Sequence, residues 1–291
     1  MLAVLFYPLP RPRNMKSVAL LVGINAYPSA PLRGCLPDVA DMHSYLLRER
    51  DWPTAHMKLL TDRDATRKGI MDGIALMARE KPDLALFAYS GHGTRVRDVD
   101  GDEAQFHSGT TYDQAIVPVD YDRTGFLTDD VLYDAFSEMP AETKIIYHLD
   151  SCFSARSERA LIARTKEFYH RRIRKQSDRT LPIRYVSSRL LQATRQQKTT
   201  GGGSTPRPVL LLSGCRSTET SADAWISGSG YRGAFTYYLL RSARALGPQA
   251  SYHAVIEDAR RLIEINRFTQ RPQITPSAHM PIGWPSQPFL Q

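Results

Sequence analysis

Two short apolar runs, each followed by small and polar residues, constrain the fold of this chain more than any other feature. Residues 84–89 and 145–149 have the length and composition of buried strands. The first run leads into Ser-Gly-His-Gly at 90–93 and the second into Asp-Ser-Cys at 150–152. Ligands bind at the carboxyl edge of a parallel sheet, where neighbouring strands lie about 4.8 Å apart. We therefore expect His92 and Cys152 to meet at that edge.

The rest of the chain alternates runs of strand length with segments of helical period, which is typical of an α/β fold. We expect strands at residues 18–24, 57–60, 84–89, 145–149, 209–213 and 273–275. We expect helices at residues 38–50, 66–80, 128–139, 234–246 and 251–266, the first of them opened by Pro37 and Asp38. This order predicts a mostly parallel sheet with helices on both faces.

The composition allows one large core or two modest ones, since 42% of the 291 residues are hydrophobic and 23% are charged. The cysteines, Cys35, Cys152 and Cys215, are few and odd in number, which argues against a disulfide framework and favours a reducing, cytoplasmic compartment. Residues 1–7 are apolar, but no basic residue precedes them and prolines follow at once. We therefore expect residues 1–15 to be a lead-in, neither a secretory signal nor a membrane span.

The net charge of +8 comes from one segment. Residues 155–208 hold 14 Lys or Arg residues against three acids and include a Gly-Gly-Gly-Ser-Thr-Pro run at 201–206. Two interpretations stay open: a solvated surface arm, or a protease-accessible linker that joins two pieces of one fold. Binding of nucleic acid is not expected, because no aromatic platform or base-reading motif accompanies the charge.

Several motifs in a fixed order resemble the caspase fold, in particular the metacaspase and bacterial orthocaspase branch of peptidase family C14. Beside the loops at 90–93 and 150–152, the matching stretches are Leu-Arg-Gly-Cys-Leu-Pro-Asp-Val at 32–39, Tyr-Asp-Gln-Ala-Ile-Val-Pro-Val-Asp at 112–120, Ser-Gly-Cys at 213–215, Thr-Ser-Ala-Asp at 220–223 and Gln-Arg-Pro-Gln at 270–273. The resemblance implies a six-stranded, caspase-like sheet. It divides the chain into a large-subunit-like part (16–154), the basic linker (155–208) and a small-subunit-like part (209–291).

The resemblance implies a cysteine endopeptidase in which Cys152 is the nucleophile and His92 protonates the leaving amine. A free cysteine has a pKa of about 8.5, so only a few per cent is thiolate at neutral pH, but that form is a strong nucleophile. The implied oxyanion donors are the backbone N–H groups of Gly93 and Cys152. This chemistry requires no cofactor. From the residues alone, an ordinary loop histidine and a buried structural cysteine remain the alternative.

The same resemblance implies that Asp38, Ser90 and Asp150 form the pocket for the side chain that precedes the scissile bond. Two carboxylates facing one cleft repel each other unless a cation joins them, and an arginine can pair with both as a planar fork. We therefore expect cleavage of proteins and peptides after Arg or Lys. The Gln-Ala-Cys-x-Gly signature of caspases that cleave after Asp is absent. For Asp38 alone, a helix cap is the alternative.

The resemblance also implies a calcium site, with calcium as an activator, at Asp113, Asp129 and Asp130. The fourth acid of the family pattern falls on Arg159, so the chain departs from the family at that position. Asp129 and Asp130 are equally typical of a helix amino terminus. An acidic run at 98–103 lacks the glutamate that ends an EF-hand loop, and we interpret it as a solvated loop.

The loop of the nucleophile reads Cys-Phe-Ser-Ala at 152–155, where the family commonly has Cys-His-Ser-Gly. Neither change removes the nucleophile or His92. The leading hypothesis is an Arg/Lys-specific endopeptidase that is regulated by cleavage in the basic linker, by itself or by an upstream protease, as in bacterial defence or programmed cell death. The alternative is a catalytically impaired caspase-like scaffold that binds an acidic partner through this linker.

Overall fold

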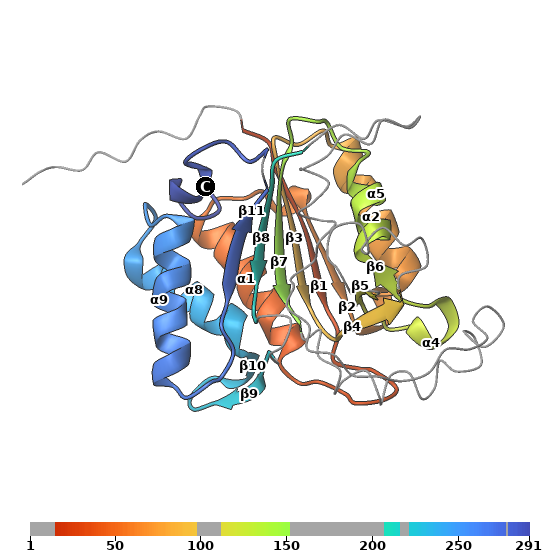
Figure 1. Cartoon of the computed structure of the whole chain (residues 1–291), viewed down its shortest axis with the longest axis horizontal. Helices are drawn as coiled ribbons and strands as arrows, with labels where there is room; N and C mark the ends of the chain where they lie inside the picture. Colours follow the sequence, from red (N-terminus) through yellow and green to blue (C-terminus); the bar gives the residue numbers. More distant parts are fainter. Residues whose placement is uncertain (1–14, 98–111, 152–206, 216–220, 278) are drawn as a thin grey trace, which may run out of the picture.

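A computed structural model describes residues 15–97, 112–151, 207–215, 221–277 and 279–291 (Figure 1). Several sequence predictions fall outside these ranges. They concern most of the lead-in, the acidic run at 98–103, the residues Cys152, Phe153, Ala155 and Arg159, and nearly all of the basic linker.

The centre of the molecule is a six-stranded sheet with the strand order β11-β8-β7-β3-β1-β2. Its strands are β1 (Ser17–Gly23), β2 (Met57–Thr61), β3 (Leu84–Ser90), β7 (Lys144–Asp150), β8 (Val209–Ser213) and β11 (Gln273–Pro276). All neighbours are parallel except β11, which runs antiparallel to β8. The prediction of a mostly parallel, six-stranded sheet is confirmed.

Helices cover both faces of this sheet, because residues along each central strand alternate between two cores. In β1, Leu20 and Val22 pack toward α2 (Arg67–Arg79) and α5 (Asp129–Phe136). Leu21 packs into the opposite core, which is formed with α1 (Cys35–Glu49), α8 (Ala234–Leu246) and α9 (Tyr252–Ile265). Figure 1 shows these two groups of helices on the two sides of the sheet.

Local caps set most of the helix ends near their predicted positions. The side chains of Thr66, Thr128 and Ser251 each accept a hydrogen bond from a backbone N–H three residues further on, which is the usual role of an N-cap. The exception is α1, which begins at Cys35, three residues before the predicted Asp38. Its first N–H groups find partners elsewhere in the chain: Cys35 donates to Asn25 Oδ1 at 2.9 Å and Gly34 to Asp223 Oδ1 at 2.7 Å.

Two small sheets were not predicted from the sequence. One consists of β4 (Gly93–Arg97), β5 (Tyr112–Ile116) and β6 (Leu127–Thr128), and the other is the hairpin β9 (Asp223–Ile226) and β10 (Gly230–Gly233). These strands are too short to show a reliable alternation of apolar residues. Figure 1 shows both small sheets beside the carboxyl ends of the parallel strands. The sheet of β4, β5 and β6 lies next to α4 (Tyr121–Thr124). Short 3-10 turns span Thr54–His56, Asp62–Asp64 and Trp284–Ser286.

The residues that follow the basic linker complete the fold of those that precede it. β8 adds to the sheet by parallel pairing with β7. Arg244 of α8 forms a salt bridge of 2.8 Å with Glu49 of α1, and the indole N–H of Trp52 donates to the backbone oxygen of Leu290 at 3.2 Å. The two parts therefore share both cores. Among the described residues, no helix has the length and the apolar character needed to cross a membrane.

Cutting the chain within the linker should leave these two parts bound to each other, because the shared sheet and cores lie outside the cut. A recognition site for a sequence-specific protease, placed at residues 201–204, allows the cut to be made at will. We expect the cut protein to elute from a sizing column at the volume of the intact chain and to give two fragments under denaturing conditions. Separate elution of the fragments under native conditions would contradict the shared cores.

Candidate active site

Strand pairing places two of the predicted pocket residues side by side. Ser90 ends β3 and Asp150 ends β7, and these two residues are partners in the parallel pairing of the strands. Partner residues of neighbouring parallel strands project from the same face of a sheet. That face is covered by α1, the helix that carries Asp38.

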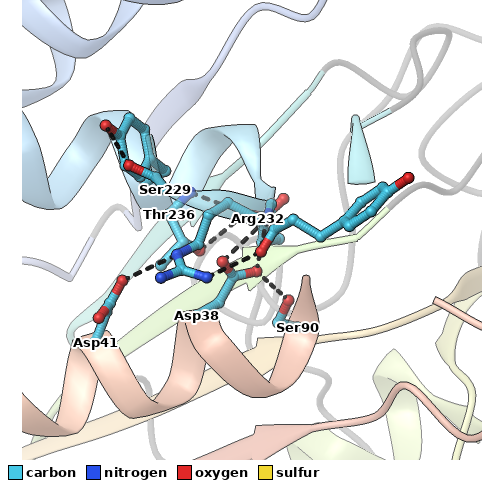
Figure 2. A network of polar contacts seen from close by, with 10 residues as sticks. Asp38, Asp41, Ser90, Ser229, Arg232 and Thr236 are labelled. Atoms are coloured by element: carbon cyan, nitrogen blue, oxygen red, sulfur yellow. Dashed lines mark hydrogen bonds and ion pairs between the residues drawn. The ribbon is translucent and has the colours of Figure 1, made fainter. Parts of the chain in front are cut away.

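Asp38 reaches from the first turn of α1 toward the part of the chain that follows the linker (Figure 2). Its carboxylate accepts a hydrogen bond from the Ser90 hydroxyl at 2.7 Å. It also accepts from the backbone N–H of Gly233, at 2.9 and 3.0 Å to its two oxygens. Asp38 therefore binds partners outside its own helix, and its alternative interpretation as a helix cap is wrong.

Asp150 is held by a second set of donors from the same region. Its Oδ2 accepts from the backbone N–H and from the hydroxyl of Thr236, each at 2.8 Å, and its Oδ1 accepts from the Ser221 hydroxyl. Since the Thr236 hydroxyl gives its hydrogen to Asp150, it accepts from Nε2 of His148, 2.8 Å away. Burial lowers the pKa of His148 to about 3, so this histidine is neutral and its Nε2 carries a hydrogen.

Both carboxylates lie against Gly233. A Cβ atom at this position would stand 2.3 Å from Oδ2 of Asp150 and 2.4 Å from Oδ2 of Asp38. Contacts this short are sterically forbidden, so only glycine fits there. Both acids consequently lie against one backbone position, where β10 meets α8.

The two carboxylates are strongly desolvated. Asp38 is 1% exposed and Asp150 is 5% exposed. Burial raises the pKa of Asp38 well above its ordinary value, and the charge of Asp150 raises it further, while the hydrogen bonds from Ser90 and Gly233 lower it. Burial also raises the pKa of Asp150, against the effect of its hydroxyl and N–H donors.

His92 lies two residues after Ser90, in the short loop between β3 and β4. Its Nε2 lies 2.7 Å from the backbone oxygen of Ala30, and its ring lies 4.5 Å from the ring of Tyr27. A carbonyl can only accept, so the neutral ring carries its hydrogen on Nε2 and leaves Nδ1 free to accept a proton. Burial lowers the pKa of His92, and the Ala30 carbonyl opposes that effect.

Of the predicted nucleophile and oxyanion donors, the structure describes only one residue. Gly93 is described as the first residue of β4, directly after His92. Cys152 lies outside the described residues, one position beyond Ser151. The roles of Cys152 as nucleophile and of Gly93 and Cys152 as oxyanion donors therefore stay predictions.

The predicted calcium ligands come from two neighbouring elements. Asp113 is a buried residue of β5, and Asp129 and Asp130 form the first turn of α5 behind the cap Thr128. Within the described residues, however, no group of three or more His, Cys, Asp or Glu side chains is arranged to hold a metal ion. The residues thus do not form a cation site as they stand, and calcium binding stays a prediction.

Sequence reasoning missed the residues that hold the acids in place. Gly233 and Thr236 lie almost 200 and about 90 residues from the carboxylates they contact, and no local signal marks them. Ser221 lies within the Thr-Ser-Ala-Asp stretch at 220–223, which could have pointed to it. Tyr27 and Ala30 sit in a loop after β1 that carries no recognisable pattern apart from its proximity to the Leu-Arg-Gly-Cys stretch.

Metacaspases are similar in sequence to most of this chain. Metacaspase-1 of Yarrowia lipolytica is 29% identical over 293 residues, which cover 90% of this chain and 62% of that protein. Metacaspase-3 of Trypanosoma brucei brucei is 29% identical over 279 residues, which cover 89% of this chain and 70% of that protein. The chain thus spans about two thirds of the length of these relatives.

Solved structures show the same fold. A protein of Geobacter sulfurreducens superposes with a TM-score of 0.68 at 21% identity, covering 95% of this chain and 98% of its own. Caspase-1 of Spodoptera frugiperda superposes with a TM-score of 0.52 at 13% identity, covering 92% of each chain. The model of the Caspase domain, Peptidase_C14, matches residues 16–280. This match covers most of the chain, and the relatives include metacaspases, as the motifs implied. The chain therefore belongs to the caspase-domain family of cysteine peptidases.

Proposed function

We propose that this protein is an endopeptidase that cleaves proteins after Arg or Lys, with Cys152 as nucleophile and His92 as general acid and base. The observation that supports this specificity best is the pair of buried carboxylates, Asp38 and Asp150, which both lie against Gly233. Buried carboxylates normally occur with a cation or a metal ion, because desolvation of an isolated charge is costly.

Among the described residues, the donors that bind the two acids are neutral. Their hydrogen bonds come from backbone N–H groups and from hydroxyls, namely those of Ser90, Ser221, Gly233 and Thr236. Among the residues that the structure describes, neither acid forms a salt bridge. A site with two carboxylates and no salt bridge within the described part of the chain is suited to a guanidinium or an ammonium group from a substrate.

Arg232, whose charge acts on Asp38, forms its ion pair with a different acid. Arg232 lies over α1 in Figure 2, and its Nε is 3.3 Å from Oδ2 of Asp41, one turn after Asp38. Its Nη1 donates to the backbone oxygen of Tyr231 at 3.0 Å. The charge of Arg232 lowers the pKa of Asp38, but it is the weakest of the effects on that acid. Arg232 therefore pairs with Asp41 and leaves Asp38 without an ion pair among the described residues.

Access to the acids requires movement. Because Asp38 and Asp150 are nearly unexposed and both lie against Gly233, a substrate side chain reaches both only when the junction of β10 and α8 shifts. We infer that the described structure represents the closed form of the pocket. This agrees with an enzyme that is held inactive until it is needed.

The proposed reaction uses His92 in the form that its surroundings favour. Its pKa is lowered by burial, so the ring is neutral near pH 7 and can accept the thiol proton of Cys152 on Nδ1. The thiolate attacks the scissile carbonyl, and the leaving amine takes the proton from His92 as the acyl-enzyme forms. Water then hydrolyses the thioester, and His92 takes a proton from that water and returns it to the thiol.

The first test compares fluorogenic peptides that differ only in the residue before the bond: Arg, Lys, Asp and citrulline, the neutral analogue of Arg. We expect cleavage after Arg and Lys and none after Asp. In Asp38→Asn, kcat/KM for Arg should fall by about 100-fold or more, while the small activity on citrulline changes little, because a buried charge pair loses one partner.

Two controls frame this experiment. Asp72→Asn alters an exposed acid of α2 that pairs with Lys68, and it should leave the preference for Arg unchanged. Cys152→Ala should abolish cleavage. Preferential cleavage after Asp, or an Arg-to-citrulline ratio that is the same in Asp38→Asn and in the parent protein, would disprove the pocket.

Regulation by cleavage in the linker gives a second test. Incubation of the purified protein should produce new amino termini within residues 156–206, and none in Cys152→Ala. Arg207 should be spared, because it is 7% exposed, its Nη1 donates to the Pro140 oxygen at 2.8 Å, and a proline follows it. Active protein without any cut in this range would rule out self-processing.

The raised pKa of Asp38 predicts how the thermal stability of the protein depends on pH, which gives a third test. A carboxyl whose pKa is higher in the folded protein stabilises the fold most below its unfolded pKa of about 3.9, and this contribution is lost as the pH rises through its folded pKa. In the parent protein, Tm should therefore fall more steeply above pH 4 than in Asp38→Asn. His148 acts in the opposite direction in both proteins, so the difference between them reports Asp38. Parallel Tm curves would show that the pKa of Asp38 is not raised.

A further inference from the structure

Two buried tyrosines, Tyr27 and Tyr89, meet at the backbone of His92, and the proposed reaction does not use them. Tyr27 comes from the loop after β1, and Tyr89 is the residue before Ser90 in β3. Their exposures are 4% and 0%, and their hydroxyl oxygens lie 3.0 Å apart. We call these two residues the tyrosine pair.

The tyrosine pair binds both polar backbone groups of His92. The N–H of His92 donates to the hydroxyl oxygen of Tyr27 at 3.0 Å, and the hydroxyl of Tyr89 donates to the carbonyl of His92 at 2.7 Å. The Tyr27 hydroxyl donates in turn to the carbonyl of Val117 at 2.9 Å, and the N–H of Val117 donates to the carbonyl of His92 at 3.1 Å. The N–H of Val117 also donates to the hydroxyl oxygen of Tyr89 at 3.3 Å, so each hydroxyl acts as a donor and as an acceptor within one closed network.

The residue before the histidine shows how closely this network fits the loop. A Cβ atom on Gly91 would lie 2.6 Å from each of the two hydroxyl oxygens. A side chain at position 91 would therefore displace the tyrosine pair. The glycine in Ser-Gly-His is explained by the space that the two hydroxyls occupy.

The loop after β1 also orients the imidazole ring. Tyr27 places its ring 4.5 Å from the ring of His92 at an angle of 48°, and Ala30 of the same loop accepts from Nε2 at 2.7 Å. Backbone and ring of His92 are thus held by one loop. Rotation of the ring would break the bond to Ala30, and displacement of the backbone would leave buried polar groups without partners.

We propose that the tyrosine pair positions His92 for proton transfer by fixing its backbone and, through the loop that carries Tyr27 and Ala30, the tautomer and direction of its ring. This inference rests on the proposed function, in which His92 moves the proton. Tyr27 and Tyr89 are positioning residues, since neither reaches a reacting atom. Precise placement of a proton-transfer group matters, because a shift of about 1 Å can cost about 100-fold in rate.

The test uses Tyr27→Phe and Tyr89→Phe, which remove one hydroxyl each, and Tyr252→Phe as the matched control. Tyr252 is also fully buried, and its hydroxyl accepts from the N–H of Leu290 at 3.1 Å in the opposite core. All three variants should lose similar stability. Only the first two should lower kcat, by about 10- to 100-fold, with little change in KM.

A second readout does not depend on activity. In full-length Cys152→Ala protein labelled with ¹⁵N-histidine, NMR should show the Nε2–H form of His92, with a pKa below that of a free histidine. Adding Tyr27→Phe or Tyr89→Phe should give a mixture of the two neutral forms and move the pKa toward about 6.5, while adding Tyr252→Phe should change neither.

The two readouts separate this inference from the proposed function. If the parent protein cleaves none of the peptides, the proposed function fails and the NMR comparison still decides the role of the tyrosine pair. If Tyr27→Phe and Tyr89→Phe match Tyr252→Phe in His92 tautomer, in His92 pKa and in kcat, the pair has a merely structural role and the inference is overturned.

Discussion

The buried contact of Asp38 and Asp150 with the junction of β10 and α8 is the interaction on which the rest of the structure depends. The carboxylates belong to the chain before the basic linker, and Gly233 and Thr236 belong to the chain after it. Leaving a buried polar group of such a network without its partner costs about 1–3 kcal/mol. The groups that would recognise a basic substrate are thus the same groups that join the two parts of the fold.

The end of β3 connects this contact with the histidine. Successive residues of a strand point to opposite faces, so Ser90 points toward α1 and binds Asp38, while Tyr89 points into the other core and binds the backbone of His92. A shift of β3 by one residue would exchange the two side chains and destroy both sites together. The alternating direction of the side chains along β3 thus fixes the position of His92 relative to the pocket.

Features that arise from local patterns could be predicted, and those that arise from distant contacts could not. The apolar runs located β3 and β7, and because parallel strands share an edge, His92 and Cys152 were expected to converge there. The pocket of Asp38, Ser90 and Asp150 was implied by the family resemblance. The start of α1 was misplaced because its first N–H groups are bound by Asn25 and by Asp223, the latter 189 residues away in the chain. Gly233 gave no signal, since only the approach of two acids to it requires a glycine.

The shape of the acid pair argues for arginine as the preferred substrate residue. Oδ2 of Asp38 and Oδ2 of Asp150 both lie next to one point beside Gly233, so a single cation that enters there can reach both carboxylates. A guanidinium is planar and weakly hydrated, with donors on several edges, whereas an ammonium is a compact, strongly hydrated point charge. The acids lose their hydration when the protein folds, so the unfavourable free energy of desolvating them is not part of substrate binding. A guanidinium that pairs with both carboxylates offsets more of this free energy than an ammonium does.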